Sequence, residues 1–230
     1  TGRAVSFPVS FADPTDAIGR TLRWWLGKEG VAVASHARAP SAPVWGPQGA
    51  TLLGEIESPL APILAAANTR SDNHAAEMLF RRTGAEYAKK GSSSAAVNTV
   101  AALVTAMGVD RPKLQVIRDG CGLSPKNLTT AGQIVALLSA LRKTRYAEGF
   151  TASLAAAGEG TVKRRFGREP FLERVFVKTG TLSGVTALSG YVKRDGGEWI
   201  VFSLLSNDEK TTTCANVHTA IVELLCRWKG

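Results

Sequence analysis

The C-terminal third of the sequence holds the pattern that most restricts the fold. Three runs rich in β-branched and aromatic residues, at 174–178, 185–193 and 199–205, predict strands. Arg194-Asp195-Gly196-Gly197 separates the last two runs, and a short glycine-containing turn of this kind joins antiparallel strands in a hairpin. A helical pattern at 213–227 follows directly. These strands and this helix form one contiguous unit, so we predict an antiparallel sheet flanked by a helix.

The rest of the sequence is mainly helical in pattern, which indicates a helical block inserted into an α/β layer. Capping residues and apolar spacing predict helices at 13–30, 58–68, 73 onward, 95–107, 130–141 and 146–157. Shorter features are predicted strands at 31–33 and 113–118, a loop at 38–49 and a glycine turn at 119–122.

Length and composition fit a folded protein without a membrane span. The 230 residues suffice for one large domain or two small lobes, and 44% hydrophobic with 20% charged residues is too apolar for a disordered chain. No run of about 18 apolar residues occurs, so we predict no transmembrane segment. The start, Thr1-Gly2-Arg3, has neither methionine nor a signal-peptide pattern, and we expect the protein's N-terminus to lie upstream.

The distribution of basic residues argues against nucleic-acid binding, and the spacing of cysteines and histidines argues against metal binding. Lysine and arginine exceed aspartate and glutamate by 28 − 19 = 9, which favours an anionic partner, but the basic residues are scattered. We therefore predict a solvated basic surface and no nucleic-acid binding. The three cysteines and three histidines show no disulfide framework and no ligand spacing, so we predict no metal and no cofactor.

Ser71-Asp72-Asn73 lies at a predicted junction between two helices. On the residues alone, the triplet is most simply an N-cap, since all three residue types are preferred there. A functional interpretation stays open, because a serine can relay a proton and an asparagine two residues later can direct its amide into the same cleft. Glu77 behind it is expected to pair with Arg81 in a helix salt bridge.

Lys178-Thr179-Gly180-Thr181 is expected where one strand ends and the next begins. A lysine on a turn between strands explains it without any function. Equally, lysine supplies positive charge, the threonine hydroxyls suit a carboxylate, and glycine lets a substrate approach the strand edge closely. Asp119 is expected to cap its own glycine turn, and Cys121 has no histidine beside it in the sequence.

Taken in order, fragments across the whole chain resemble the class C low-molecular-mass penicillin-binding proteins, the D-alanyl-D-alanine carboxypeptidase/endopeptidase family. The fragments are Asp13-Pro14, Ser58-Pro59-Leu60, Ser71-Asp72-Asn73 with Ala76-Glu77, Asp119-Gly120-Cys121-Gly122-Leu123-Ser124, Gly160-Thr161, Arg164-Arg165, Lys178-Thr179-Gly180-Thr181-Leu182 and Ala187-Leu188-Ser189-Gly190-Tyr191. The resemblance implies a penicillin-binding-protein/serine β-lactamase-like transpeptidase fold. Its helical lobe would span about 58–166, and its sheet lobe 1–57 and 167–230.

The family's activity is serine acyl transfer on peptidoglycan stem peptides that end in D-Ala-D-Ala, with β-lactams as inhibitors. Carried over, the resemblance implies that Ser71 shuttles a proton to the leaving amine and Asn73 holds the substrate amide. Lys178 would supply positive potential beside Ser71. A periplasmic or cell-envelope location is implied in the same way.

The same resemblance places substrate-binding groups on the second motif. Thr179 and Thr181 would bind the substrate carboxylate beside Gly180, and the Thr181 backbone N–H would be one oxyanion donor. The sequence departs from the family at Cys121, where serine is usual, and at Pro125, where arginine is frequent.

The largest departure concerns the nucleophile. No serine in the sequence is followed by lysine three residues later, so the Ser-x-x-Lys motif of the family is absent. We expect this motif upstream, in another part of the same enzyme, with this chain inactive alone. The alternative is a non-catalytic module that binds peptidoglycan peptides or a protein.

Overall fold

The computed structural model describes residues 11–33, 57–109 and 116–228, and the chain divides into two compact units, Thr1–Ile56 and Glu57–Gly230. In the first unit, helix α1 (Pro14–Lys28) begins as predicted, with the Asp13 side chain accepting from the Asp16 N–H. The predicted strand at 31–33 is wrong. These residues are irregular, because the Val31 N–H instead closes the helix end on the Leu26 carbonyl at 2.8 Å. The predicted loop at 38–49 lies outside the described residues.

The second unit contains a four-stranded antiparallel sheet in the order β1-β2-β3-β4. The strands are β1 (Ala155–Ala156), β2 (Val175–Leu182), β3 (Val185–Lys193) and β4 (Trp199–Asn207). The predicted hairpin between β3 and β4 is confirmed, since the Gly197 N–H donates to the Arg194 carbonyl at 2.9 Å. Gly197 has φ +84°, a conformation that glycine adopts without the strain imposed by a Cβ atom.

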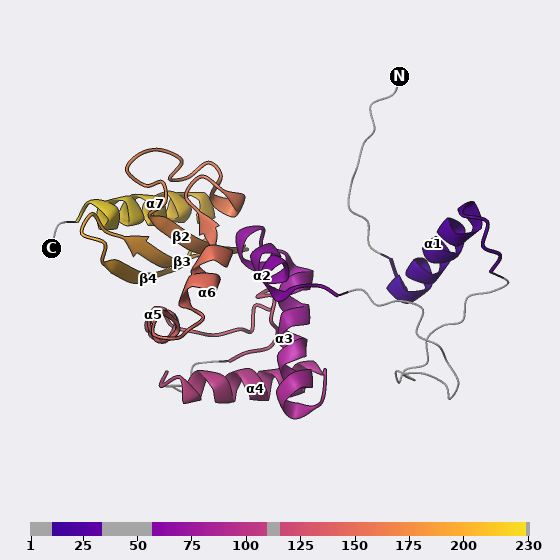
Figure 1. Cartoon of the computed structure of the whole chain (residues 1–230). Helices are drawn as coiled ribbons and strands as arrows, with labels where there is room; N and C mark the ends of the chain where they lie inside the picture. Colours follow the sequence, from indigo (N-terminus) through magenta and orange to yellow (C-terminus); the bar gives the residue numbers. More distant parts are fainter. Residues whose placement is uncertain (1–10, 34–56, 110–115, 229–230) are drawn as a thin grey trace, which may run out of the picture. The chain divides into compact units, whose positions relative to one another are not determined.

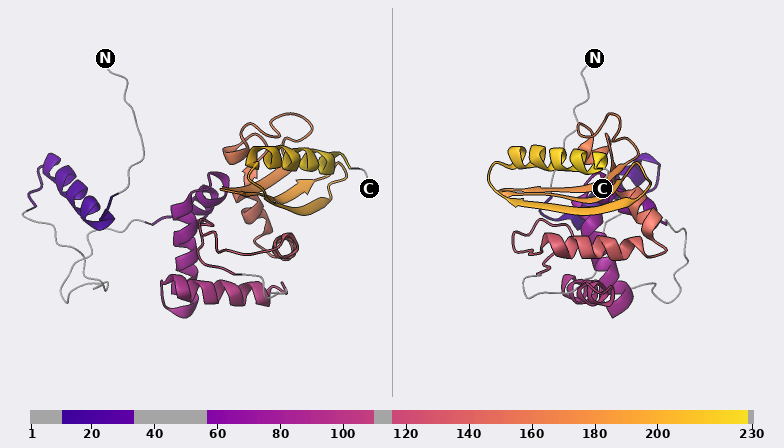
Figure 2. Two further views of the ribbon diagram at one scale, coloured as in Figure 1. Left: turned by 180° about the vertical axis from the view of Figure 1, so that it is seen from behind. Right: turned by 90° about the vertical axis from the view of Figure 1, so that its left-hand side faces the viewer.

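Helices cover both faces of this sheet. Helix α7 (Thr211–Arg227) packs on one face, and α5 (Ala131–Arg142) lies against the other (Figures 1 and 2). The core on the α7 side consists largely of side chains that are almost fully buried: Val175, Val177, Leu188, Val192, Phe202, Val222 and Cys226. On the α5 side, Tyr191 and Leu154 are buried with Leu138. The predicted α/β architecture is therefore confirmed.

The helical block follows the prediction closely. Its helices are α2 (Leu60–Thr69), α3 (Asn73–Ala88), α4 (Ser93–Ala106), α5, α6 (Ala147–Ser153) and the 3-10 turn η1 (Gly160–Val162). Helix α6 ends four residues before the predicted position 157, because Ala155 and Ala156 pair with β2. Of the predicted strand at 113–118, the described part makes one bridge, from Val116 to Leu128.

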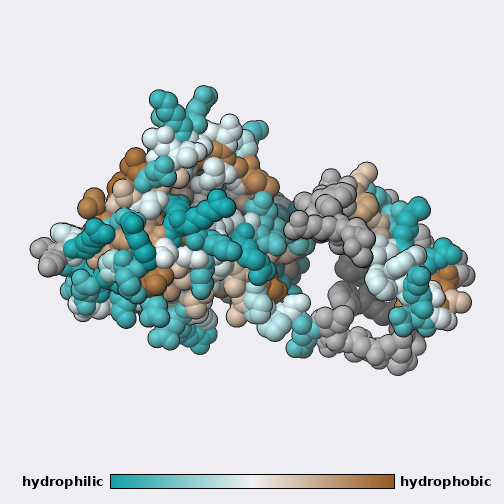
Figure 3. Space-filling model, turned by 90° about the horizontal axis from the view of Figure 1, so that it is seen from above, coloured by the Kyte–Doolittle hydropathy of each residue, from teal (hydrophilic) through white to brown (hydrophobic). Residues whose placement is uncertain are grey.

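The surface and helix lengths add two further observations. Within the described ranges, no helix is long and apolar enough to cross a membrane. On the face shown in Figure 3, hydrophilic side chains predominate and hydrophobic ones are scattered among them. The lobe boundaries at 57, 58, 166 and 167 stay a prediction.

Candidate active site

Ser71 occupies a strained turn between α2 and α3. Its φ is +57°, in the left-handed region that residues with a side chain rarely adopt. Asp72 is the N-cap of α3, and its Oδ1 accepts from the Ala75 N–H at 2.9 Å. The capping function predicted for the triplet therefore belongs to Asp72, and the Ser71 hydroxyl is directed elsewhere.

Lys178 is the partner of that hydroxyl. Its Nζ donates to Ser71 Oγ at 2.9 Å and to the Thr179 carbonyl at 2.6 Å. Burial lowers the pKa of Lys178, because desolvation penalises its charged form. The arrangement places a cation with a lowered pKa beside a hydroxyl, which is suited to polarising that hydroxyl and helping it pass on a proton.

The Lys178-Thr179-Gly180-Thr181 motif lies inside β2 and not at its end. The predicted strand end at Lys178 is wrong, because antiparallel pairing with β3 continues through Thr181↔Thr186 and Leu182↔Val185. Pairing with a neighbouring strand extends the strand beyond what local pattern indicates. At Gly180, an added Cβ would lie 3.3 Å from the Ala187 Cβ, a tight contact.

The other edge of β2 is open along the motif. Strand β1 pairs only with Phe176 and Val177, and none of the described strands pairs with β2 beyond them on this edge. The Val175 carbonyl accepts from Ala157 on the β1 side, whereas the Arg174 carbonyl accepts from Lys193 on the β3 side.

Residues along an antiparallel strand direct their backbone groups alternately to the two sides. Thr179 and Thr181, which lie four and six residues after Val175, therefore present their N–H and C=O groups at the open edge. Such an edge can bind an extended peptide as an additional strand.

The remaining predicted site residues lie on the same elements. Asn73 is the first residue of α3 and is exposed; Thr181 is exposed on β2, and Thr179 is half-buried. The structure thus brings Ser71 and Lys178 together, while the roles of Asn73, Gly180 and the two threonines stay predictions.

Glu77 has a larger structural role than its sequence context indicated. The expected ion pair with Arg81 is confirmed at 3.1 Å. Glu77 Oε2 also accepts from the Gly120 N–H at 2.8 Å, and Oε1 accepts from Ser93 Oγ at 3.4 Å. Glu77 therefore fastens the glycine turn to α3. In that turn, Asp119 accepts from the backbone as predicted.

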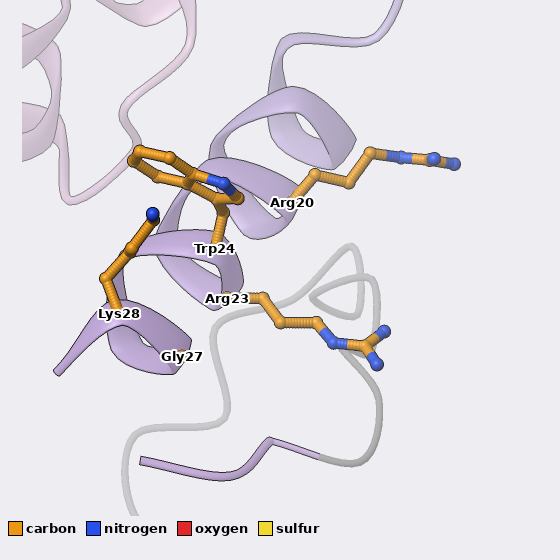
Figure 4. Close-up of a pocket in the computed structure, with 5 residues that line it drawn as sticks. All are labelled: Arg20, Arg23, Trp24, Gly27 and Lys28. Carbon is orange, nitrogen blue, oxygen red and sulfur yellow. The ribbon is translucent and has the colours of Figure 1, made fainter. Parts of the chain in front are cut away.

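Two other features offer no chemistry of this kind. The described residues contain no group of three or more His, Cys, Asp or Glu side chains that could hold a metal ion. A hollow on the first unit is lined by Arg20, Arg23, Trp24, Gly27 and Lys28, all from α1 (Figure 4). Lys28 Nζ lies 5.3 Å from the Trp24 ring centroid, and no acid or nucleophile is among the described residues that line the hollow.

Comparison with known families explains this arrangement. The sequence model of the D-Ala-D-Ala carboxypeptidase 3 (S13) family matches residues 1–228. The chain belongs to this family. The matched range covers both short motifs, so Ser71 and Lys178 meet within an S13 sequence.

Two curated S13-type relatives define the scale of the similarity. The chain is 33% identical over 224 residues to a D-alanyl-D-alanine carboxypeptidase from Actinomadura sp. (strain R39), which covers 95% of this chain and 41% of that protein. It is 28% identical over 211 residues to the D-alanyl-D-alanine carboxypeptidase DacB of Haemophilus influenzae, covering 89% and 43%. The chain thus spans less than half the length of these relatives.

Solved structures identify the fold. Penicillin binding protein 4 (dacB) from Haemophilus influenzae, in complex with a novel β-lactam, superposes with TM-score 0.81 and 23% identity, covering 96% of this chain and 53% of that one. A variant of the TLA-1 extended-spectrum β-lactamase superposes with TM-score 0.51 and 20% identity, covering 73% and 61%. The penicillin-binding-protein/β-lactamase-like fold predicted from the sequence is confirmed.

Proposed function

We propose that this S13 chain forms part of the active site of a D-alanyl-D-alanine carboxypeptidase/endopeptidase that cleaves peptidoglycan stem peptides through a serine acyl-enzyme. The observation that carries the proposal is the contact between Lys178 Nζ and Ser71 Oγ beside the open edge of β2. Relatives named D-alanyl-D-alanine carboxypeptidases support the substrate class.

In the proposed reaction, the stem peptide lies along the open edge of β2 as an added strand. The backbone N–H of Thr181 stabilises the oxyanion that forms when the nucleophilic serine attacks, and one such donor is typically worth about 3 kcal/mol at the transition state. Thr179 and Thr181 hydroxyls bind the terminal carboxylate, and Gly180 leaves room for its approach. Asn73 holds the substrate amide.

Proton transfer is assigned to the first motif. As the D-Ala-D-Ala peptide bond breaks, the Ser71 hydroxyl gives its proton to the leaving amine. It takes up in exchange the proton that the attacking serine loses. The Lys178 ammonium stabilises this hydroxyl and attracts the substrate carboxylate. Water then hydrolyses the acyl-enzyme and releases the shortened peptide.

The nucleophile is assigned to a segment outside these 230 residues. The sequence has no Ser-x-x-Lys motif, and the chain spans 41% of the Actinomadura relative. The composition of strand β4 is a further argument that another segment packs beside it. Its nine residues, Trp199–Asn207, include none of the charged residues or prolines that usually protect an exposed edge strand. Its outer edge is unpaired among the described strands, and natural proteins usually protect or cover such an edge.

Location and partners follow from this activity. A substrate in the cell wall requires a periplasmic or cell-envelope location, and β-lactams would act as inhibitors that acylate the serine. The net charge of +9 is compatible with an anionic envelope surface. A second candidate, a non-catalytic peptidoglycan-peptide or protein binding module, is favoured by one observation, the missing Ser-x-x-Lys motif.

The test is an intact-mass spectrum of the native-source protein before and after incubation with benzylpenicillin. We expect a Ser-x-x-Lys-bearing segment associated with this chain to gain the penicilloyl mass. A penicilloyl adduct on these 230 residues alone would overturn the assignment of the nucleophile. Binding of a D-Ala-D-Ala peptide without turnover, even with the nucleophile-bearing segment present, would instead establish the binding module.

A further inference from the structure

The turn that carries Ser71 is tied to α6 through one buried residue. Thr69 Oγ1 donates to the Ser153 carbonyl at 2.7 Å, and Asn68 Nδ2 donates to Ser153 Oγ at 2.8 Å. Ser153 is 4% exposed, and its own hydroxyl donates to the Phe150 carbonyl at 2.7 Å. The last two residues of α2 are therefore docked on the last residue of α6, and the two helices lie against each other (Figure 1).

This attachment continues to the other half of the site. Strand β1 begins two residues after Ser153 and pairs with Val177, the residue before Lys178. Ser71 lies two residues after Thr69. Hydrogen bonds and short chain segments therefore form a closed loop through the site. The hydrogen-bonded links join Thr69 to Ser153, β1 to β2, and Lys178 to Ser71. A closed path of short links restricts the separation of its two reactive ends.

Gly160, in η1, lies in close backbone contact with Thr69 at the end of α2. Its φ is +48°, and a Cβ placed there would overlap the carbonyl oxygen of Thr69. Only glycine permits this approach of the two backbones. The hydrogen bonds to Ser153 and the Gly160 contact therefore hold the end of α2 from two directions.

A restraint of this kind is required by the conformation of Ser71. A non-glycine residue in the left-handed region is higher in energy by roughly 1–3 kcal/mol and persists where the surroundings hold it in place. A hydrogen bond from the Asp72 N–H to the Ala66 carbonyl, at 3.0 Å, closes the turn that contains Ser71. Removing the attachment of Thr69 should loosen this closing bond.

We propose that Thr69, Ser153 and Gly160 form a clamp that holds the Ser71 hydroxyl within reach of the Lys178 ammonium. They are positioning residues, since none of them contacts the reacting atoms. The catalytic consequence rests on the proposed function above, whereas the structural consequence does not.

The structural arm measures hydrogen exchange of the Asp72 amide in the intact enzyme, which includes the nucleophile-bearing segment. Thr69→Val removes the hydroxyl and keeps the shape, and we expect exchange to become at least about fivefold faster. Thr69→Ser keeps the hydroxyl and should restore protection. Thr105→Val is the matched control, because Thr105 Oγ1 donates to the Ala101 carbonyl within α4, away from the clamp.

A second readout follows Lys178 directly. Alkaline titration of its ¹⁵Nζ signal by NMR should shift to higher pH in Thr69→Val, because a loosened turn lets water reach the ammonium. Unchanged exchange of the Asp72 amide together with unchanged Lys178 titration would overturn the clamp.

The catalytic arm measures the rate of acylation by benzylpenicillin. We expect Thr69→Val to slow acylation about tenfold, Thr69→Ser to recover it and Thr105→Val to match the wild type. If the Asp72 amide of Thr69→Val exchanges faster but the variant is acylated at the wild-type rate, the positioning role is overturned. If the wild type itself is not acylated in the presence of its nucleophile-bearing segment, the proposed function fails, and the clamp is decided by exchange and titration alone.

Discussion

Lys178 Nζ lies 2.9 Å from Ser71 Oγ, although the two residues are 107 positions apart in the sequence. One comes from the middle of a strand and the other from a left-handed turn between two helices. Their meeting couples the sheet to the helical block, and it is the contact on which the proposed chemistry depends.

The conformation of Ser71 predicts that two substitutions which abolish its hydroxyl equally will differ in their effect on stability. Ser71→Ala and Ser71→Gly both remove the hydroxyl, and each should slow acylation of the intact enzyme by about 100-fold or more. Glycine tolerates φ +57°, whereas alanine does not, so the glycine variant should be more stable by about 1 kcal/mol. Urea denaturation of both variants checks this, and an alanine variant as stable as the glycine variant would contradict it.

The lowered pKa of Lys178 predicts an early alkaline limit for activity. Acylation needs the ammonium form, so its rate should begin to fall at a pH below the ordinary lysine value of 10.5. A pH series of benzylpenicillin acylation measures this limb. In Lys178→Arg the guanidinium stays protonated, so the limb should disappear even if the rate at neutral pH is lower.

The same shift has a consequence for stability. Because the folded-state pKa lies below the unfolded value, the folded protein loses this proton first as pH rises. Burial of the charge therefore costs stability at neutral pH, and that cost declines between the lowered pKa and 10.5.

His218 predicts a loss of stability in acid. This residue is 3% exposed, its Nε2 lies 2.9 Å from Ser206 Oγ, and its Nδ1 has no partner among the described residues. Burial, and secondarily the Arg165 charge, lower the pKa of His218 below 6.5. The unfolded chain therefore binds a proton first, so the stability is complete above pH 6.5 and declines as pH falls from there towards the lowered pKa.

Denaturation of His218→Gln across a pH series checks this prediction. Glutamine can keep a hydrogen bond to Ser206 but does not titrate, so the variant should lose less stability than the wild type between about pH 7 and 5. Equal slopes for the two proteins would show that His218 is not the titrating group.

Glu77 and Glu86 offer a matched pair on one helix. Each makes an i,i+4 ion pair, but the Glu77 side chain is 19% exposed and also accepts from Gly120, whereas that of Glu86 is 56% exposed. Glu77→Ala should destabilise the protein by about 1.5–3 kcal/mol, because a partly buried hydrogen bond from a backbone N–H to a charged carboxylate is lost. Glu86→Ala should cost less than about 0.5 kcal/mol. Similar losses in urea denaturation would mean that Glu77 does not anchor the glycine turn.

Local signals in the sequence predicted most elements correctly. Asp13 and Thr130 start helices because their side chains accept backbone N–H groups within three residues. Two of the errors lie where a distant partner decides. Helix α6 stops at Ser153 because the residues after it pair with β2, and β2 continues through the lysine motif because β3 pairs along its whole length.

The candidate site shows the same division. Ser71 and Lys178 are identified as site residues only through resemblance to a family, since on the residues alone the serine triplet is most simply an N-cap and the lysine motif is equally well explained as a turn. Nothing in the local sequence indicated a positioning role for Thr69, Ser153 or Gly160, because their contacts join positions 84 or more residues apart or depend on close backbone approach.

The sequence by itself determined the helix starts, the hairpin and the α/β order of elements, because caps, turns and apolar periodicity act over a few residues. Tertiary structure alone decided that Ser71 is held in a left-handed conformation and that its hydroxyl meets Lys178. Those outcomes depend on packing between α2, α6 and β2, and packing between distant segments leaves no pattern in the local sequence of any one of them.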